Sequence, residues 1–314
     1  MRAKPKPKPM PMPKPLFALR VCRALLAPWV LLMHRVLLGS WVLLGSWVLL
    51  GSWVLLTRRA SLVLQAGLLL LTGAALAQGD GRRSGLDFMS PALQALQYDD
   101  AKNPAMLWVQ DGAALWRTPA GAAGKRCADC HGDAAQSMAG VAARYPAWDS
   151  GVPGGQVLNL DGRINACRQR HQQAPALATD SADLLALGAY LGLQSRGLPV
   201  SPPDDARLAP LRSQGQALWQ QRLGQLNLAC LHCHDQRAGL RLGGAAIPQG
   251  HATGYPSYRL EWQGLGSLQR RLRGCVVGVR AAPFAPDATE WLALEAWLAL
   301  RAAGMAVEVP AVRP

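Results

Sequence analysis

The sequence predicts an all-α protein that contains two tandem copies of one helical unit. Residues that favour helix, above all Ala, Leu, Arg and Gln, are abundant, whereas only 3 of the 314 residues are Phe. The segment GAALW at 112–116 returns as GQALW at 215–219. Likewise, LGAYLGLQSRG at 187–197 returns as LEAWLALRAAG at 294–304. Two matched pairs in the same order indicate that one unit has been used twice.

The closing segment of each copy predicts an amphipathic helix. In the second copy, Asp287 and Glu290 have the spacing of a capping-box variant, so we expect the helix to begin beside them. The apolar positions that follow recur at helical spacing and form one stripe: Trp291, Leu294, Trp297 and Leu298. Such a stripe is typical of a helix packed against a core.

Composition divides the chain into three segments. The Pro-rich stretch LPVSPPDD at 198–205 predicts a linker between the two copies. We therefore expect one domain over 78–200 and a second over 201–314. Residues 1–77 do not have the pattern of a folded domain, because they combine Lys-Pro alternation with three successive GSWVLL hexapeptides at 39–56.

The end of this first segment has the features of a secretory signal. Arg58 and Arg59 precede an apolar run that ends in the A-x-A sequence at 75–77. We expect cleavage after Ala77 and export to the periplasm, which leaves no stable membrane span. A membrane anchor is the alternative, because the apolar run is long.

The formal net charge of +14 gives a misleading impression of function. All 19 acidic residues lie at or beyond Asp80, whereas 10 of the 33 basic residues lie within the leader. The remaining chain has 23 basic and 19 acidic residues, a net charge of +4. It contains no basic run interleaved with aromatic residues, so we expect no nucleic-acid partner.

Each copy contains one C-x-x-C-H motif, the attachment signal for c-type haem. Two thiols one helical turn apart add to the vinyl groups of the porphyrin, and the adjacent His ligates the iron. Zinc would require two cysteine pairs about 12–20 residues apart, whereas these pairs are 103 residues apart. The sequence therefore predicts two covalently bound haem c groups in two cytochrome c-like domains. The motifs are Cys127-Ala-Asp-Cys130-His131 and Cys230-Leu-His-Cys233-His234.

Methionine, the usual sixth ligand of an electron carrier, is poorly placed in this chain. Met138 is too close to His131 to reach round the ring, and Met305 lies beyond the closing helix. Cys167 and Cys275 instead follow the two motifs at similar intervals, so we expect each to be the second axial ligand of one haem. A disulfide between these two cysteines is an alternative.

Two histidines, His171 and His251, are further candidates for the sixth position. A thiolate ligand would favour ferric iron and a low potential, which does not suit a general electron carrier. It suits a site at which the sulfur itself reacts.

Arginines gather before the second lone cysteine. Arg270, Arg271 and Arg273 precede Cys275, and in a helix Arg271 would share a face with Cys275 at i−4. Guanidinium groups bind sulfonate or phosphate oxygens and favour a cysteine thiolate. The alternative is a solvated charged face. We expect an anion site here.

The stretch from CLHCHDQRAG through QGHATGYPSYRLEWQGLGSLQRRLRGC resembles the A subunits of the sulfur-oxidation cytochrome complex SoxAX, in particular the dihaem forms. The resemblance implies that His131 and Cys167 ligate the first haem, and His234 and Cys275 the second. It also implies that Cys275 is catalytic and carried as a persulfide, and that Arg271 binds thiosulfate.

The activity that this resemblance implies is that of an L-cysteine S-thiosulfotransferase. Thiosulfate would be joined oxidatively to a cysteine of the carrier SoxYZ, and two electrons would leave through a SoxX-like monohaem cytochrome c subunit. Two alternatives stay open: a thiosulfate dehydrogenase that forms tetrathionate, and a passive dihaem electron-transfer protein without a substrate.

Overall fold

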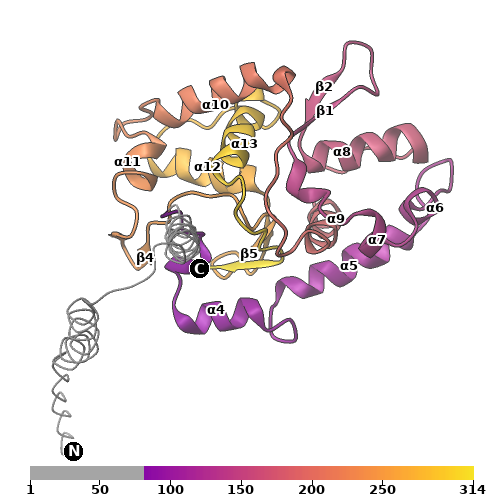
Figure 1. Cartoon of the computed structure of the whole chain (residues 1–314), viewed down its shortest axis with the longest axis horizontal. Coiled ribbons are helices and arrows are strands. Elements are labelled where there is room, and N and C mark those ends of the chain that lie inside the picture. Colours follow the sequence, from indigo (N-terminus) through magenta and orange to yellow (C-terminus); the bar gives the residue numbers. More distant parts are fainter. Residues whose placement is uncertain (1–80) are drawn as a thin grey trace, which may run out of the picture. The chain divides into compact units, whose positions relative to one another are not determined.

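Two helical repeats lie side by side in the computed structural model, which describes residues 81–314 (Figure 1). The first repeat occupies the magenta side of the figure, and the second occupies the orange and yellow side. The signal segment expected at 1–77 lies outside the described residues. Within the described part of the chain, no helix is long and apolar enough to cross a bilayer.

Both repeats have the same order of elements: a long helix, a short motif helix, a hairpin, a cysteine-bearing helix and a closing helix. The first repeat consists of α5 (Ala105–Arg117), α6 (Cys127–His131), α7 (Ala134–Ser137), η2 (Ala142–Arg144), β1 (Ala147–Asp149), β2 (Gln156–Leu158), α8 (Leu160–Cys167), the π-helical turn η3 (Arg168–Gln172) and α9 (Ala182–Leu193).

The second repeat follows after the short helix η4 (Ala206–Leu208). Its elements are α10 (Ala209–Gln220), α11 (Cys230–His234), β3 (Arg241–Leu242), β4 (Ala245–Ala246), β5 (Ser257–Arg259), β6 (Gly264–Gly266), α12 (Leu268–Gly278), α13 (Thr289–Arg301) and β7 (Ala311–Arg313).

The core of each repeat is a crossing of its first and last long helices, α5 with α9 and α10 with α13. A glycine lies at each crossing. A Cβ atom on Gly112 would lie 2.1 Å from the Ala186 carbonyl oxygen, and one on Gly215 would lie 2.0 Å from that of Ala293. No side chain fits at either distance, so each glycine permits the close approach of two backbones. These glycines open the repeated GAALW and GQALW segments.

The predicted closing helix is present, but it begins differently from the prediction. Its first residue is Thr289 and its N-cap is Ala288, which has no side-chain atom that can accept a hydrogen bond. Asp287 therefore lies one residue outside the cap, and the expected capping box does not form. Trp291, in the first turn, is fully buried, and its Nε1 donates to the Ala285 carbonyl at 2.8 Å.

Short strands complete the fold, and sequence periodicity did not predict them because most have only three residues. β1 pairs with β2 in an antiparallel hairpin. β5 pairs antiparallel with β6 and parallel with the C-terminal strand β7, so that Arg259 lies opposite Arg313. In both repeats a hairpin leads directly into the helix that carries the lone cysteine.

The segment before α5 contacts the second repeat as well as the first. It contains η1 (Leu86–Phe88) and α4 (Pro91–Tyr98). The Gln97 side chain accepts a hydrogen bond from the Val312 backbone at 3.1 Å, and Arg82 donates to the Ala303 carbonyl at 2.8 Å. The domain boundary at 200/201 stays a prediction. The structure adds that the segment before α5, which belongs to the predicted first domain, contacts the second repeat.

We predict that Gly215→Ala destabilises the protein by about 1–3 kcal/mol, because the added methyl group forces α10 away from α13. Urea unfolding of the haem-loaded protein would measure the loss. The matched control is Gly278→Ala at the end of α12, where a Cβ would meet nothing within 4 Å. Equal stability of the two variants would contradict the close crossing.

Candidate functional site

The first C-x-x-C-H motif forms the single-turn helix α6. Cys127 and Cys130 therefore lie one turn apart, and His131 ends the helix. The Trp116 ring, at the end of α5, lies 5.7 Å from the His131 ring, and its Nε1 donates to the Gly132 carbonyl at 3.0 Å. α5 thus holds the histidine against one wall of the site.

A cavity of about 270 Å³ opens beside this motif. Cys127, Cys130, His131 and Cys167 all line it. Cys167 reaches the cavity because it is the last residue of α8, a helix whose N-cap Asn159 accepts a hydrogen bond from the Gly162 backbone at 2.8 Å. The structure therefore brings together the four residues expected to hold the first haem.

The lining of this cavity fits a haem. Arg168 Nε and Gln172 Oε1 are buried there and have no hydrogen-bond partner among residues 81–314. Buried polar atoms of this kind are costly, so they indicate a polar group of a ligand. Burial, with Arg163 and His171 nearby, also lowers the pKa of His131. Its imidazole is thereby kept neutral, the form that ligates iron.

The second motif has the same construction. His234 ends α11, and the Trp219 ring lies 5.6 Å from it. His234 Nδ1 is 2.7 Å from the Pro248 carbonyl oxygen, and this hydrogen bond leaves Nε2 free to bind a metal. Cys230 and Cys233 precede it on α11 but do not line the neighbouring cavity.

That neighbouring cavity, of about 160 Å³, contains His234, Cys275 and Arg271. α12 begins after Ser267, whose Oγ accepts a hydrogen bond from the Arg270 backbone at 3.1 Å. The arginine cluster therefore lies on a helix, the condition on which Arg271 and Cys275 share a face, and Arg271 lies one turn before Cys275. Arg270 and Arg273 do not line the cavity.

The Cys275 thiol is disposed to ionise. Burial raises its pKa, but a hydrogen bond with His234 and the positive charges of Arg271 and Arg259 outweigh that effect and lower it overall. By contrast, burial raises the pKa of the Cys230 thiol to about 11. A cysteine near cations forms the thiolate that binds metals and attacks sulfur.

The alternatives for the sixth position have different outcomes. All six cysteines of the described residues are free, and Cys167 and Cys275 line separate cavities, so the structure contains no disulfide between them. His171 lines the first cavity and His251 the second, so both stay candidate ligands.

Sequence reasoning missed three charged residues at these sites. Arg163 lies four residues before Cys167, as Arg271 does before Cys275, and it lines the first cavity. Asp149 binds Arg163, and Arg259 lines the second cavity. The i−4 spacing from the lone cysteine would have identified Arg163. Asp149 and Arg259 lie on strands of only three residues, which are too short to give a recognisable pattern in the sequence.

Comparisons with known proteins agree with this geometry. The model of the "SoxA/TsdA, cytochrome c domain" family matches the chain twice, at 111–200 and 214–307. The chain belongs to this family.

Relatives in the family share most of the chain. The L-cysteine S-thiosulfotransferase subunit SoxA of Rhodovulum sulfidophilum is 38% identical over 74% of this chain and 81% of its own length. The protein of the same name from Pseudaminobacter salicylatoxidans is 38% identical over 73% and 80%. A crystal structure of SoxXA from P. pantotrophus has a TM-score of 0.71 and 33% identity, and covers 74% of this chain and 87% of that chain.

These findings confirm the resemblance to SoxA and the fold of two cytochrome c-like domains. Proteins with cytochrome c domains bind haem c covalently, and the C-x-x-C-H motifs of this chain provide the required thiols. The roles of single residues and the number of haems stay predictions.

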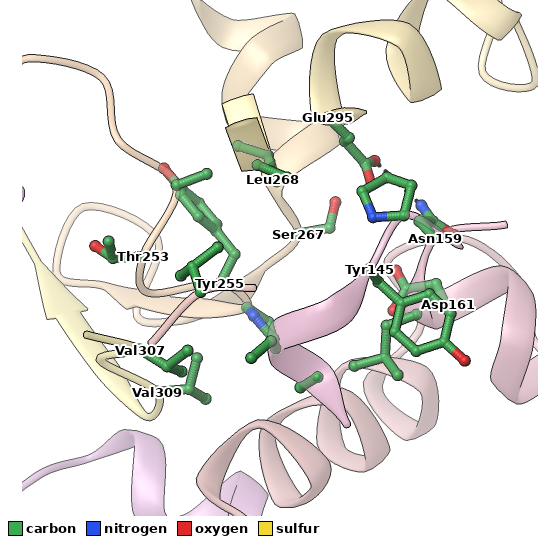
Figure 2. Close-up of a pocket in the computed structure, with 18 residues that line it drawn as sticks. Tyr145, Asn159, Asp161, Thr253, Tyr255, Ser267, Leu268, Glu295, Val307 and Val309 are labelled. Carbon is green, nitrogen blue, oxygen red and sulfur yellow. Dashed lines mark hydrogen bonds between the residues drawn. The ribbon is translucent and has the colours of Figure 1, made fainter. Parts of the chain in front are cut away.

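A third cavity, of about 130 Å³, lies between the repeats and contains none of the predicted ligands (Figure 2). Asp161 enters it from α8 and Glu295 from α13. Burial raises the pKa of each carboxyl group to about 7, and the charge of Asp161 contributes at Glu295. Gln269 and Asn159 donate hydrogen bonds to Glu295 Oε1 at 2.8 and 3.1 Å and oppose this rise.

We predict that stability falls as the pH rises from about 4 to 7, because the folded protein retains protons on these groups that the unfolded chain releases. Glu295→Gln should remove part of this loss and be more stable than wild type at pH 8 by about 2 kcal/mol. Urea unfolding at pH 5 and pH 8 would measure both effects. Glu290→Gln, on the same helix but outside the cavity, should retain the wild-type pH dependence. A Glu295→Gln variant that also retains it would contradict the account.

Proposed function

We propose that this chain is the thiosulfate-binding haem subunit of an L-cysteine S-thiosulfotransferase. A bond forms between the sulfane sulfur of thiosulfate and a cysteine sulfur of a carrier protein, while the S–H bond of that cysteine breaks. One proton and two electrons are released. The observation that carries this proposal is the meeting of Cys275, His234 and Arg271 in one cavity.

The proposal assigns two haem c groups to the chain. Cys127 and Cys130 would bind the first covalently, and Cys230 and Cys233 the second. The axial ligands would be His131 with Cys167 at the first iron and His234 with Cys275 at the second. A haem held by His234 and Cys275 would supply a one-electron acceptor, and the two electrons would leave one at a time to a c-type cytochrome.

The side chains of the second site have separate tasks. The Arg271 guanidinium binds the sulfonate oxygens of thiosulfate, since a planar fork of donors matches them. The same charge helps to lower the pKa of Cys275 and so favours the thiolate, which could hold an additional sulfur atom as a persulfide. The partly apolar lining, with Leu268 and Leu272, limits water around the anion.

Partners and location follow from the relatives and from the leader. Because the chain is similar to the crystal structure of SoxXA from P. pantotrophus, we propose a SoxX-like monohaem cytochrome as the partner that receives the electrons. The carrier would be SoxYZ, which presents the cysteine. Because covalent haem attachment and a signal segment both suit an exported protein, the complex would act in the periplasm.

Thiosulfate dehydrogenase is the second candidate, because the matching family model includes TsdA as well as SoxA. A thiolate-ligated haem beside Arg271 would also suit the coupling of two thiosulfates to tetrathionate. Product analysis with and without the carrier separates the two reactions. A passive electron carrier would retain its exchange rate in Arg271→Ala.

We predict that Cys275→Met retains both haems but loses at least about 1000-fold of thiosulfate-dependent activity, because a thioether can ligate iron but cannot carry sulfur. Intact mass would count the haems, and carrier thiosulfonation would measure activity. Cys167→Met is the matched control at the first site and should retain most activity. Full activity in Cys275→Met would eliminate the proposal.

A further inference from the structure

The two repeats place opposite charges at the same position of their hairpins. Asp149 is the third residue of β1 and comes four residues after Tyr145. Arg259 is the third residue of β5 and comes four residues after Tyr255. Each strand leads through a hairpin into a helix that carries a lone cysteine, so the two residues occupy equivalent places beside equivalent sites.

In the first repeat, the acidic residue binds two of the local arginines. Asp149 is buried, and its carboxylate binds Arg163 at 2.7 Å and also binds Arg170. The hydrogen bond from Arg170, with those cations, lowers the pKa of Asp149 to about 2. Arg163 is the counterpart of Arg271, one turn before the cysteine. The guanidinium at this position therefore already has its anion.

In the second repeat, the corresponding guanidinium has no such partner. Among the described residues no carboxylate binds Arg271. Arg259 is only 9% exposed, and its one ion pair joins Nε to Glu261 Oε1 at 2.7 Å. The two terminal nitrogens of Arg259 are left without a hydrogen bond to the described residues. Its register partner Arg313 is held by Glu308 and Gln97.

Arg271 lines the cavity of Cys275 together with Arg259, whose two terminal nitrogens have no partner among the described residues, and no described Asp or Glu side chain lines it with them. Two cations in a confined site are costly unless an anion joins them. A tetrahedral oxyanion with several equivalent oxygens can accept hydrogen bonds from two guanidinium groups at once. At this position the second repeat therefore has a cation near Arg271, where the first repeat has a carboxylate that binds Arg163.

We propose that Arg259 is a second anion-binding residue of the substrate site, which holds the sulfonate group of thiosulfate together with Arg271 and so directs the sulfane sulfur toward Cys275. This inference rests on the proposed function. In the first repeat the equivalent residue is Asp149, whose carboxylate binds Arg163, so the arginine one turn before Cys167 is not available to a substrate in the same way.

The test is Arg259→Gln in the full complex, assayed with thiosulfate and the carrier. The KM for thiosulfate should rise about 10- to 100-fold, the loss typical of one charge-assisted hydrogen bond, with a smaller change in kcat. Arg259→Lys should lie between wild type and the Gln variant. It provides a second variant if the first does not fold.

The matched control is Arg270→Gln. Arg270 and Arg259 lie against the same Trp262 ring, at 4.1 and 5.1 Å from its centroid, but Arg270 does not line the cavity. The control should retain the wild-type KM. Haem content, absorption spectrum and reduction potential should be unchanged in all three variants.

An unchanged KM in both Arg259 variants would overturn the inference and leave the proposed function intact. A shifted reduction potential or lost haem, with KM unchanged, would instead assign Arg259 to a haem propionate and also overturn it. If the wild-type complex itself fails to modify the carrier with thiosulfate, the proposed function fails first. The outcomes are therefore distinguishable.

Discussion

The site depends on the meeting of Cys275 and His234, whose side chains are hydrogen-bonded in one cavity. Two separate helices create it. α11 presents the histidine with its Nδ1 bound to a carbonyl group, and α12 presents the cysteine eight residues after the N-cap Ser267. Because the helix fixes Arg271 one turn before Cys275, the sulfur and the anion-binding group are positioned by the same element. A small shift of α12 would displace both.

The duplication explains why the chain contains two similar sites with different chemistry. Both repeats use a glycine at the helix crossing, a tryptophan beside the motif histidine and a cysteine at the same distance from its helix N-cap. They differ in charge. In the first repeat Asp149 binds Arg163 and Arg170. In the second repeat Arg259 takes the equivalent place, and no described carboxylate binds Arg271, which is the arrangement on which the proposed anion site rests.

Much of this arrangement could be predicted from the sequence, because haem attachment requires fixed local spacing. The C-x-x-C-H motifs, the internal repeat and the i−4 relation of Arg271 to Cys275 are all local patterns that one helix preserves. The role of Asp149 and the place of Arg259 depend on short strands and on contacts across the fold. α13 begins at Thr289, later than the capping pattern at Asp287 and Glu290 predicted. Trp291 is buried in its first turn, and local capping rules do not take such burial into account.

Near-infrared magnetic circular dichroism of the ferric protein tests the central claim most directly, because it identifies the pair of axial ligands at each low-spin haem. The account predicts that the C-terminal haem has one imidazole and one thiolate. A spectrum with only histidine–histidine or histidine–methionine ligation would contradict it, since no reactive sulfur would then lie on the iron beside the arginines.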